Sequence, residues 1–341
     1  MKVVVTGAAG FIGSHVVDAL CTSGARVIGV DSLDPGVFRA APGYLNPRAD
    51  YCFVDLRHFQ PDDRFADVEA VVHLAALGGV TRAAREPANV IDANCTGTAK
   101  LVSAMASWPR LRRIIHASSF SVYGSNYTYR CPQCGTERDG ARRDEDMREG
   151  RFEVLCAKCG TEARIVPITE RASPNPLETY GSSKYMQELC YRGLTKAPLT
   201  ILRFSSVYGD RLRLDDGEAT IIAKMAGWIR DGIRPRLFED GKQIRDWVYV
   251  GDIVATVQAL LAARQAPTLV NVCTGVPATL EGACVTIAKA MKRECPPDVV
   301  GGFRTGDMRH CLGDPSTVTE VMGRKPLPLS EGALLAFAPK D

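Results

Sequence analysis

Apolar positions along the chain fall into short runs, and these are separated by stretches in which apolar side chains recur at helical spacing. Runs of strand length lie at residues 1–6, 26–30, 51–54, 70–74, 113–117, 236–238 and 269–272. Helical spacing follows the first run, a second helix is expected after Pro87, and a third runs from Thr179 to Cys190. Because strands that alternate with helices build a parallel sheet covered by helices, the pattern predicts an α/β fold.

The first run leads directly into a glycine turn, Gly7, Gly10 and Gly13, and then into a helix. The glycines permit a turn that a Cβ would block, let the backbone approach a pyrophosphate at the positive helix end, and let helix and strand pack closely. The second run ends in Asp31, whose carboxylate suits the ribose hydroxyls of NAD and repels the 2′-phosphate of NADP. A plain turn residue is the alternative for Asp31. We expect a Rossmann-type doubly wound sheet that binds NAD.

Tyr180 and Lys184 lie one turn apart in the third predicted helix, so both side chains share one face. On that face the ammonium is expected to lower the pKa of the phenol and to hold the nicotinamide ribose. Ser119, just after the run at 113–117, offers a hydroxyl for the same reacting oxygen. Tyr-x3-Lys is common on surface helices, so its interpretation as an acid–base site depends on the dinucleotide fold before it.

Two near-copies of one motif interrupt this pattern, Cys131-Pro-Gln-Cys134-Gly-Thr and Cys156-Ala-Lys-Cys159-Gly-Thr. Four thiolates on two tight turns are the ligand set of a closed tetrahedral zinc site, and two disulfides are the alternative. The other eight cysteines lack paired spacing and lie mostly in apolar stretches, as reduced thiols do in a cytosolic protein. The sequence therefore predicts a structural zinc and a cytoplasmic location.

The composition of the chain argues against several classes of binding partner. The 341 residues suffice for two domains, a net charge of +3 is too small to favour a polyanion, and no apolar run has membrane-spanning length. The segment 126–166 carries eight basic and eight acidic residues, which argues against a nucleic-acid partner. Two further interpretations of this segment remain: a lid or subunit contact over the substrate, and a folding unit in which a metal supplies what a polar segment cannot bury.

Taken together, these features resemble the extended short-chain dehydrogenase/reductase family, in its NAD-dependent nucleotide-sugar epimerase/dehydratase branch. The resemblance covers nearly all of the chain apart from 126–166. Its motifs occur in the family's order: Gly7-x2-Gly10-x2-Gly13, Asp31, Asp55-Leu56, His73-Leu-Ala-Ala76, Asn94-x2-Gly97-Thr98, Ser119 five residues before Gly124, Tyr180-x3-Lys184, Arg203-x4-Tyr208-Gly209, Gly241-x3-Arg245-Asp246 with Asp252, and Arg304-x-Gly306-Asp307.

The resemblance implies a role for each matched residue. Tyr180 is the base that takes a proton from a sugar hydroxyl while NAD accepts hydride from the same carbon, and Lys184 and Ser119 assist. Cofactor contacts are implied for Gly7, Gly10, Phe11, Ile12, Gly13, Asp31, Asp55, Leu56, Leu74, Ala75, Ala76, Asn94, Ala117, Tyr180 and Lys184. Substrate contacts are implied for Gly79, Ser119, Ser121, Ser206, Arg245, Arg304 and Asp307, with the arginines at the nucleotide diphosphate.

Departures from the family pattern narrow the reaction. Members that eliminate water carry an Asp-Glu pair after the active-site hydroxyl residue, where this chain has Phe120 and Ser121, so a 4,6-dehydratase is disfavoured. Ser206 replaces the family's usual Asn near the diphosphate. His73 is expected to be structural. Arg82 and Arg85 are candidates for a uronate carboxylate, although a solvated helix face is the favoured interpretation of both.

We therefore expect an NAD-dependent nucleotide-sugar 4-epimerase that works through a 4-keto intermediate, on a UDP-sugar and as a homodimer. The alternatives are a UDP-hexuronate decarboxylase or another 4-keto-forming enzyme, a simple reductase, and a non-catalytic NAD-binding sensor. The predicted units are an NAD-binding domain (1–125, 167–206 and 245–275), a zinc ribbon inserted at 126–166, and a smaller substrate-binding domain (207–244 and 276–341) that covers the sugar.

Overall fold

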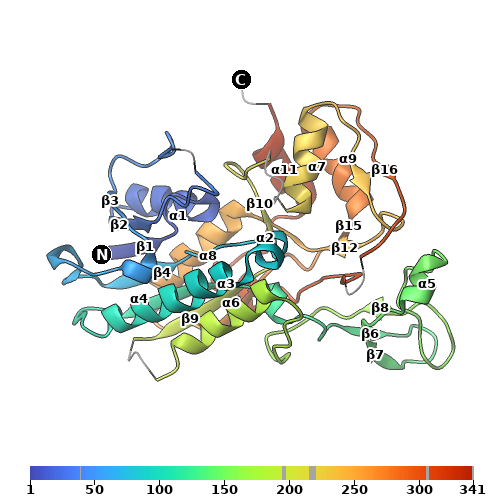
Figure 1. The fold of residues 1–341 in the computed structure, drawn as a ribbon, viewed down its shortest axis with the longest axis horizontal. Helices are drawn as coiled ribbons and strands as arrows, with labels where there is room; N and C mark the ends of the chain where they lie inside the picture. The colour runs from blue at the N-terminus through green and yellow to red at the C-terminus, as the bar shows by residue number, and fades with distance from the viewer. Residues whose placement is uncertain (39, 194–196, 215–219, 305–306, 340–341) are drawn as a thin grey trace.

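A seven-stranded parallel sheet forms the centre of the molecule in the computed structural model, which describes residues 1–38, 40–193, 197–214, 220–304 and 307–339 (Figure 1). Its order is β14-β9-β5-β4-β1-β2-β3. The strands are β1 (Lys2–Thr6), β2 (Arg26–Asp31), β3 (Asp50–Phe53), β4 (Ala70–His73), β5 (Arg113–Ser119), β9 (Leu199–Phe204) and β14 (Leu269–Val272). All neighbours pair in parallel, so the predicted Rossmann-type sheet is confirmed.

Helices cover both faces of the sheet because successive side chains of a buried strand point to opposite faces. Val3 and Val5 of β1 pack in one apolar cluster, whereas Val4 packs in another. The first cluster holds α1 (Phe11–Thr22), α8 (Val250–Ala262) and α10 (Ser316–Met322). The second holds α4 (Gly97–Met105) and Tyr191, the residue that directly follows α6 (Thr179–Cys190). No helix in the described part of the chain is long and apolar enough to cross a membrane.

The expected helix after Pro87 is divided into three segments. It begins as α3 (Pro87–Ile91), passes through a single π-helical segment (Asp92–Thr96) and continues as α4. A short helix α2 (Val80–Arg85) precedes it, and both α2 and α3 pack against α6. Short 3-10 turns occupy Leu56–His58, Asp63–Phe65 and Phe120–Val122.

A smaller unit with its own apolar core lies beside the sheet (Figure 1). It contains α7 (Ile221–Arg230), α9 (Leu280–Ala290) and α11 (Leu329–Phe337), which pack around Trp247 and Leu237. Its strands form three two-stranded pairs: β10 (Ser206–Tyr208) with β13 (Trp247–Tyr249), β11 (Arg236–Leu237) with β16 (Asp298–Val299), and β12 (Ile244–Arg245) with β15 (Ala278–Thr279). The strand expected at 236–238 is β11.

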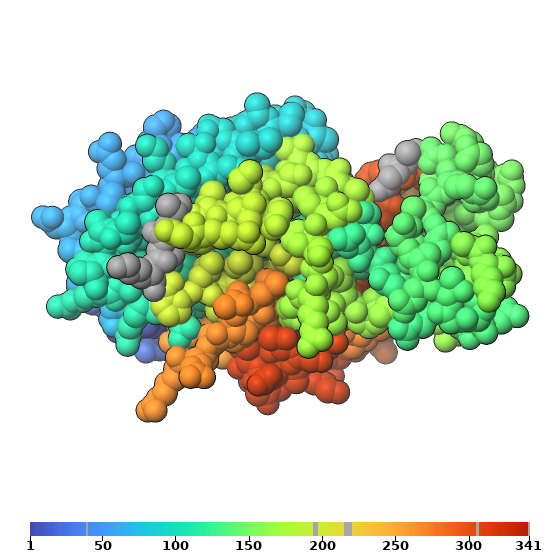
Figure 2. All heavy atoms as spheres, turned by 90° about the horizontal axis from the view of Figure 1, so that it is seen from below, coloured from blue at the N-terminus to red at the C-terminus, as the bar shows by residue number. Residues whose placement is uncertain are grey.

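The cysteine-rich insertion projects from one end of the molecule, beside the C-terminal part of the chain (Figures 1 and 2). It has a three-stranded antiparallel sheet of β6 (Thr128–Arg130), β7 (Glu137–Asp139) and β8 (Arg164–Ile165). A short helix, α5 (Asp144–Arg148), lies between β7 and β8 in the sequence. Its Tyr129, Val154 and Ala163 are buried in a cluster with Phe120 and Cys311. These apolar side chains share a core with the main body, as expected for a segment that has no core of its own.

Candidate active site

The glycine turn after β1 has the geometry that its sequence predicts. Gly7 has a φ of +67°, and a Cβ there would lie 2.9 Å from the backbone nitrogen of Ala75. A Cβ on Gly13 would lie 1.9 Å from the carbonyl oxygen of Gly7. Larger residues at either position would therefore push the turn away from α1 or from the segment after β4. The turn ends at Gly10, the N-cap of α1, where helix N–H groups suit a pyrophosphate.

Asp31 closes this turn from the end of β2. Its carboxylate accepts hydrogen bonds from the backbone N–H of Ala9 (2.9 Å) and of Leu33 (2.9 Å). Burial raises the pKa of Asp31, and these backbone donors oppose the rise. Because each carboxylate oxygen has two lone pairs, both oxygens can still accept a hydroxyl hydrogen. Asp31 thus supports the glycine turn and also suits a ribose.

A cavity of about 380 Å³ runs along the carboxyl ends of the strands, from the glycine turn to Tyr180. Every residue predicted to contact the cofactor lines this cavity except Asn94. The amide of Asn94 is instead buried, where it bonds both backbone groups of Leu77 and the hydroxyl of Ser183. Asn94 therefore joins the segment after β4 to α6, and its neighbour Ala93 lines the cavity.

Several lining residues were missed by the sequence analysis: Ser32, Asp34, Val37, Phe38, Arg57 and Phe204. Four of them lie in the loop after β2, where no periodic pattern marks a site. The sequence could have indicated Arg57, since it follows the predicted site residue Asp55 by two positions. The two side chains form an ion pair of 2.7 Å, and the Arg57 guanidinium holds the pKa of Asp55 below its usual range.

Tyr180 is positioned by the start of α6. The Glu178 side chain caps this helix and accepts hydrogen bonds from the backbone N–H of Tyr180 (2.6 Å) and Gly181 (2.7 Å). Gly181 then packs on the turn that follows β5, because a Cβ at this position would lie only 2.5 Å from the carbonyl oxygen of Ser121. This close approach places the Ser119 hydroxyl near the Tyr180 phenol, whose pKa it acts to lower. The three predicted catalytic residues thus lie within one site.

The net effect of the surrounding protein is to raise the pKa of the Tyr180 phenol. Burial raises that pKa to about 12, the nearby Glu178 carboxylate adds to the rise, and the hydrogen bond with Ser119 opposes it. Burial also lowers the pKa of Lys184 to about 7. The phenol pKa is therefore raised in the protein alone and not lowered by Lys184 as expected, because loss of hydration dominates at both groups.

Lys184 is the first member of a buried polar chain. Its ammonium donates to Gln187 Oε1 (2.5 Å), and the Gln187 amide donates to the hydroxyl of Thr98 (2.6 Å). Thr98 contacts His73 Nε2 (2.9 Å), and His73 Nδ1 contacts the hydroxyl of Thr6 (2.6 Å). Burial lowers the pKa of His73 to about 3. The predicted structural role of His73 is confirmed, since its ring links three elements of the core.

The predicted substrate residues lie outside the cavity lining, where the structure describes them. The Arg245 guanidinium donates to the carbonyl oxygens of Arg309 (3.0 Å) and Met308 (3.2 Å). Arg304 is exposed and lies over the ring of Phe238 at 5.3 Å. Arg245, Arg304 and Asp307 thus gather around one segment, 304–309, whose residues 305 and 306 lie outside the described part. Ser206 pairs with Trp247 in β10 and β13, and Gly79 is the N-cap of α2.

Arg82 and Arg85 of α2, the candidates for a uronate carboxylate, differ in their exposure to solvent. Arg85 is exposed and pairs with Glu86, as a solvated helix face implies. The Arg82 side chain is only 8 % exposed and forms an ion pair of 3.1 Å with Asp34, a residue of the cavity lining. The interpretation of Arg82 as a solvated residue was therefore wrong, because the loop after β2 folds back over α2.

The four motif cysteines converge in the insertion. Their sulfur atoms all lie within 4.8 Å of one another, and three of the pairs are 3.4 to 3.7 Å apart. A tetrahedron of thiolates around zinc has sulfur–sulfur distances of about 3.8 Å, whereas a disulfide would require about 2.05 Å. These thiols therefore fit zinc and do not form disulfides.

Both cysteine turns have the same backbone. Gly135 N donates to the carbonyl oxygen of Cys131 and Gly160 N donates to that of Cys156, each at 3.0 Å. The two glycines have φ values of +71° and +72°. The Thr136 hydroxyl hydrogen-bonds Cys134 and lowers the pKa of its thiol to about 6, which favours the thiolate that a metal needs.

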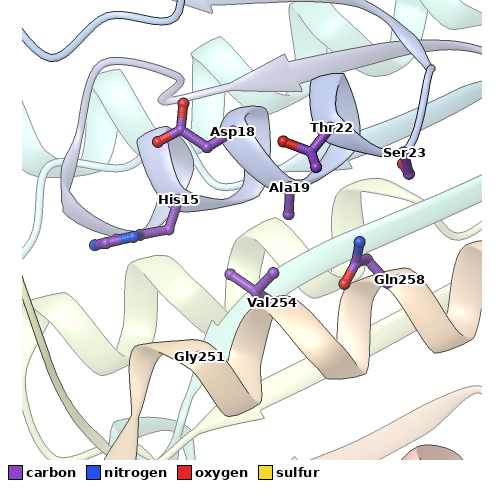
Figure 3. Close-up of a pocket in the computed structure, with 8 residues that line it drawn as sticks. All are labelled: His15, Asp18, Ala19, Thr22, Ser23, Gly251, Val254 and Gln258. Atoms are coloured by element: carbon purple, nitrogen blue, oxygen red, sulfur yellow. The ribbon is translucent and has the colours of Figure 1, made fainter. Parts of the chain in front are cut away.

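Another depression lies between α1 and α8, on the helical layer over one face of the sheet (Figure 3). Of its lining residues, His15 donates a hydrogen bond from Nε2 to the carbonyl oxygen of Asp210 (2.9 Å), and burial lowers the pKa of His15. The depression is apart from the carboxyl ends of the strands and from the predicted catalytic residues. We assign no chemistry to it.

A glycine turn, a terminal aspartate and a Tyr-Lys-Ser site at the carboxyl ends of a parallel sheet define a dinucleotide-dependent enzyme of the short-chain dehydrogenase/reductase class. Within this class, residues 3–145 and 156–273 match the NAD dependent epimerase/dehydratase family, and the chain belongs to that family. The resemblance predicted from the motifs is thus confirmed.

Relatives and solved structures agree with this assignment. The chain is 30 % identical to a dTDP-L-rhamnose 4-epimerase of Burkholderia thailandensis, over 95 % of this chain and 90 % of the relative. It is 28 % identical to a UDP-glucose 4-epimerase of Mycolicibacterium smegmatis, over 97 % and 96 %. Among solved structures, MoeE5 in complex with UDP-glucuronic acid and NAD has a TM-score of 0.76 and 26 % identity, over 99 % of this chain and 98 % of that one.

Proposed function

We propose that this protein is an NAD-dependent nucleotide-sugar 4-epimerase. The single observation that carries the proposal is one continuous cavity, lined by the glycine turn and Asp31 at one end and by Tyr180 and Lys184 at the other. Such a cavity joins a dinucleotide cradle to an acid–base group. The names of the two relatives described above, both nucleotide-sugar 4-epimerases, support the same activity.

NAD fits the residues that line this cavity. The N-terminus of α1 and the glycine turn would hold its pyrophosphate, Asp31 its adenosine ribose, and Lys184 its nicotinamide ribose. When bound, NAD accepts a hydride from the sugar and returns it, so no external oxidant is consumed. The binding of NAD by MoeE5, which has the same fold, supports this choice.

Tyr180 acts on the proton of the sugar hydroxyl. The phenolate takes this proton as the hydroxyl carbon is oxidised, and the phenol returns it after the 4-keto sugar has turned over. With a phenol pKa of about 12 in the protein alone, the base form needs added positive charge close by, which oxidised nicotinamide carries. The Ser119 hydroxyl, which acts on the pKa of this phenol, would bind the same sugar oxygen. Lys184, whose pKa is about 7, is poised to bind a ribose hydroxyl in either protonation state.

Epimerisation is favoured over elimination by the environment of Phe120. The side chain is buried in an apolar cluster and meets the Tyr123 ring edge-on at 5.5 Å. Elimination of water requires an acid and a base beyond the tyrosine, and a hydrocarbon ring supplies neither. Decarboxylation of a uronate shares the first hydride step and remains the second candidate, which the identity of the product distinguishes.

We propose a UDP-sugar as substrate, since two of the three proteins compared above carry UDP-sugars in their names or complexes. A suitable experiment incubates the purified protein with UDP-, dTDP-, GDP- and CDP-sugars and identifies the products by nuclear magnetic resonance. We expect C4 epimerisation of a UDP-sugar without net NADH release, and loss of about 10²- to 10⁴-fold in kcat for Tyr180→Phe. Tyr185→Phe, on the same helix, is the matched control. A decarboxylated product, or a fully active Tyr180→Phe, would overturn the assignment.

We further propose one structural zinc, held by Cys131, Cys134, Cys156 and Cys159. The converging sulfur atoms and the repeated turn support it. With four protein ligands the metal has no open position for water, so it serves structure and not hydrolysis.

The three-unit division predicted from the sequence is also proposed for this chain. Separate apolar clusters support the division, with one on each face of the sheet, one around Trp247, and one under the insertion.

A homodimer is part of the proposal as well. Ile91 of α3 and Met186 of α6 are 47 % and 49 % exposed and belong to helices that pack together. Sedimentation equilibrium tests the dimer.

A further inference from the structure

The insertion is joined to the smaller unit by buried charges. Arg309 is fully buried, and its guanidinium forms ion pairs of 2.7 Å with Glu239 and with Asp240. The same guanidinium binds Glu153 of the insertion through Nε (3.0 Å) and Nη2. A buried arginine with three carboxylate partners is well compensated. One of those partners is supplied by the insertion.

Arg142 of the insertion makes a second buried, charged contact with the smaller unit. Its side chain is 4 % exposed and lies 3.0 Å from Glu239, which is itself 3 % exposed. Its second terminal nitrogen donates to the carbonyl oxygen of Asp307 at 2.8 Å. The insertion therefore contacts both the 239–240 turn and the 307–310 segment with buried, charged groups.

His310 and Tyr129 add two further contacts. His310 Nε2 lies 3.0 Å from Glu153, and the backbone N–H of His310 donates to the Tyr129 hydroxyl at 3.2 Å. Burial acts to raise the pKa of Glu153, but hydrogen bonds from His310 and Arg309 hold it at about 2. Glu153 is thus a carboxylate at neutral pH, and it bridges two residues of the same segment.

This segment in turn supports Arg245. The Arg245 guanidinium has two of its donors on the carbonyl oxygens of residues 308 and 309. Arg304 and Asp307 lie on the same stretch of chain. Any shift of the 307–310 backbone would therefore move the groups that are proposed to bind the nucleotide diphosphate, while the Tyr180 site lies on other elements, α6 and the end of β5.

We propose that the cysteine-rich insertion is a positioning module for the substrate's diphosphate, in which Arg142 and Glu153 hold the 307–310 segment and, through it, Arg245. The inference rests on the proposed function. Neither Arg142 nor Glu153 touches substrate; both are positioning residues. A metal in the cysteine site would keep the insertion rigid enough for this task. Because Arg142 is buried and paired with Glu239 of the smaller unit, its charge is not available to a nucleic acid.

The test compares Arg142→Gln and Glu153→Gln with Arg130→Gln. Arg130 is a suitable control because it is exposed and pairs with Glu137 inside the insertion. Dissociation constants for UDP and UDP-glucose are measured by calorimetry, together with KM, kcat, NAD content and melting temperature. Hydrogen exchange is followed in peptides that cover 304–310 and 178–190.

We expect Arg142→Gln and Glu153→Gln to weaken UDP binding and raise KM by about tenfold, because a charged hydrogen bond is lost from the supporting segment. Exchange at 307–310 should rise, whereas kcat, NAD content and exchange at 178–190 should stay within about twofold of wild type. Arg130→Gln should behave as wild type in every measurement.

Several outcomes would overturn the inference. The first is wild-type affinity for UDP in either variant, the second is a lower kcat at unchanged KM, and the third is unaltered hydrogen exchange at 307–310. Unfolding of both variants would show that the network serves general stability and not positioning. Failure of the proposed function has a different signature: the wild type itself binds no nucleotide or nucleotide-sugar of the panel, whatever the exchange data show.

Discussion

Gly181 lies against the carbonyl oxygen of Ser121, so closely that a Cβ at position 181 would come within 2.5 Å of it. The contact joins the first turn of α6 to the turn after β5, and these two segments carry Tyr180 and Ser119. Alanine usually stabilises a helix relative to glycine. At this position the backbone oxygen cannot yield without moving the catalytic turn.

Gly181→Ala should therefore lower kcat by at least about tenfold, since misplacement of reacting groups by about 1 Å can reduce rates 10²-fold. The measurement is steady-state kinetics beside NAD content, which should be unchanged. Gly43→Ala is the control, because a Cβ there meets no described atom within 4 Å. Wild-type kcat in Gly181→Ala would mean that the turn adjusts freely.

Acid should destabilise the protein through His116. Burial lowers the pKa of this histidine well below its usual value, with Lys184 and His73 adding to the effect, and neither ring nitrogen has a partner among the described residues. As the pH falls through 6.5 the unfolded chain takes up a proton that the folded protein does not, so stability decreases with falling pH.

Between pH 6.5 and 5.5, the free energy of unfolding should therefore decrease by about 1 kcal/mol less in His116→Phe than in wild type. Urea unfolding at pH 5.5, 6.5 and 7.5 measures this difference. His58→Gln, at an exposed position, should keep the wild-type pH dependence. An unchanged slope in His116→Phe would show that His116 is not a source of the acid sensitivity.

Removal of a cysteine ligand should release the metal and loosen the insertion. In Cys134→Ser and Cys159→Ser we expect the zinc content to fall from one per chain to near zero, with lower melting temperature and lower activity in parallel. Structural zinc can contribute on the order of 10 kcal/mol to local folding. Elemental analysis and calorimetry provide the measurements, with Cys52→Ser outside the cluster as control. A wild-type protein without zinc, or full activity in both variants, contradicts the proposed site.

The ion pair between Arg82 and Asp34 should slow the loss of NAD. It connects α2, after β4, to the loop after β2, and Asp34 also lines the cavity. Arg82→Gln breaks a largely buried pair and should accelerate NAD release about tenfold. The rate can be followed by the fluorescence of NADH or by retained NAD after dialysis. Arg85→Gln is the control on the same helix, and equal release rates in the two variants would refute the prediction.

The sequence determined those features that depend on a few consecutive residues. The bounds of α6 and β14 match the predicted ranges, because an apolar run or a helical period is present in the segment itself. The glycine turn and the two cysteine turns were predictable for a similar reason: positive φ and close backbone approach select glycine locally. From the order of these elements, and the rules for parallel sheets, a cavity at the carboxyl ends of the strands followed, and nearly all the residues proposed to hold the cofactor line it.

The tertiary structure decided what depends on burial and on contacts between distant segments. Arg142 pairs with Glu239, and Glu153 with Arg309, across 97 and 156 residues of sequence. The net charge of the insertion is zero whether its charges pair internally or reach another unit, so composition could not reveal this. The pKa values of Tyr180 and Lys184 could not be predicted either, although their spacing suggested that the ammonium lowers the pKa of the phenol. Their pKa values are governed by the water that the fold removes from each group, and desolvation is a property of the whole packed structure.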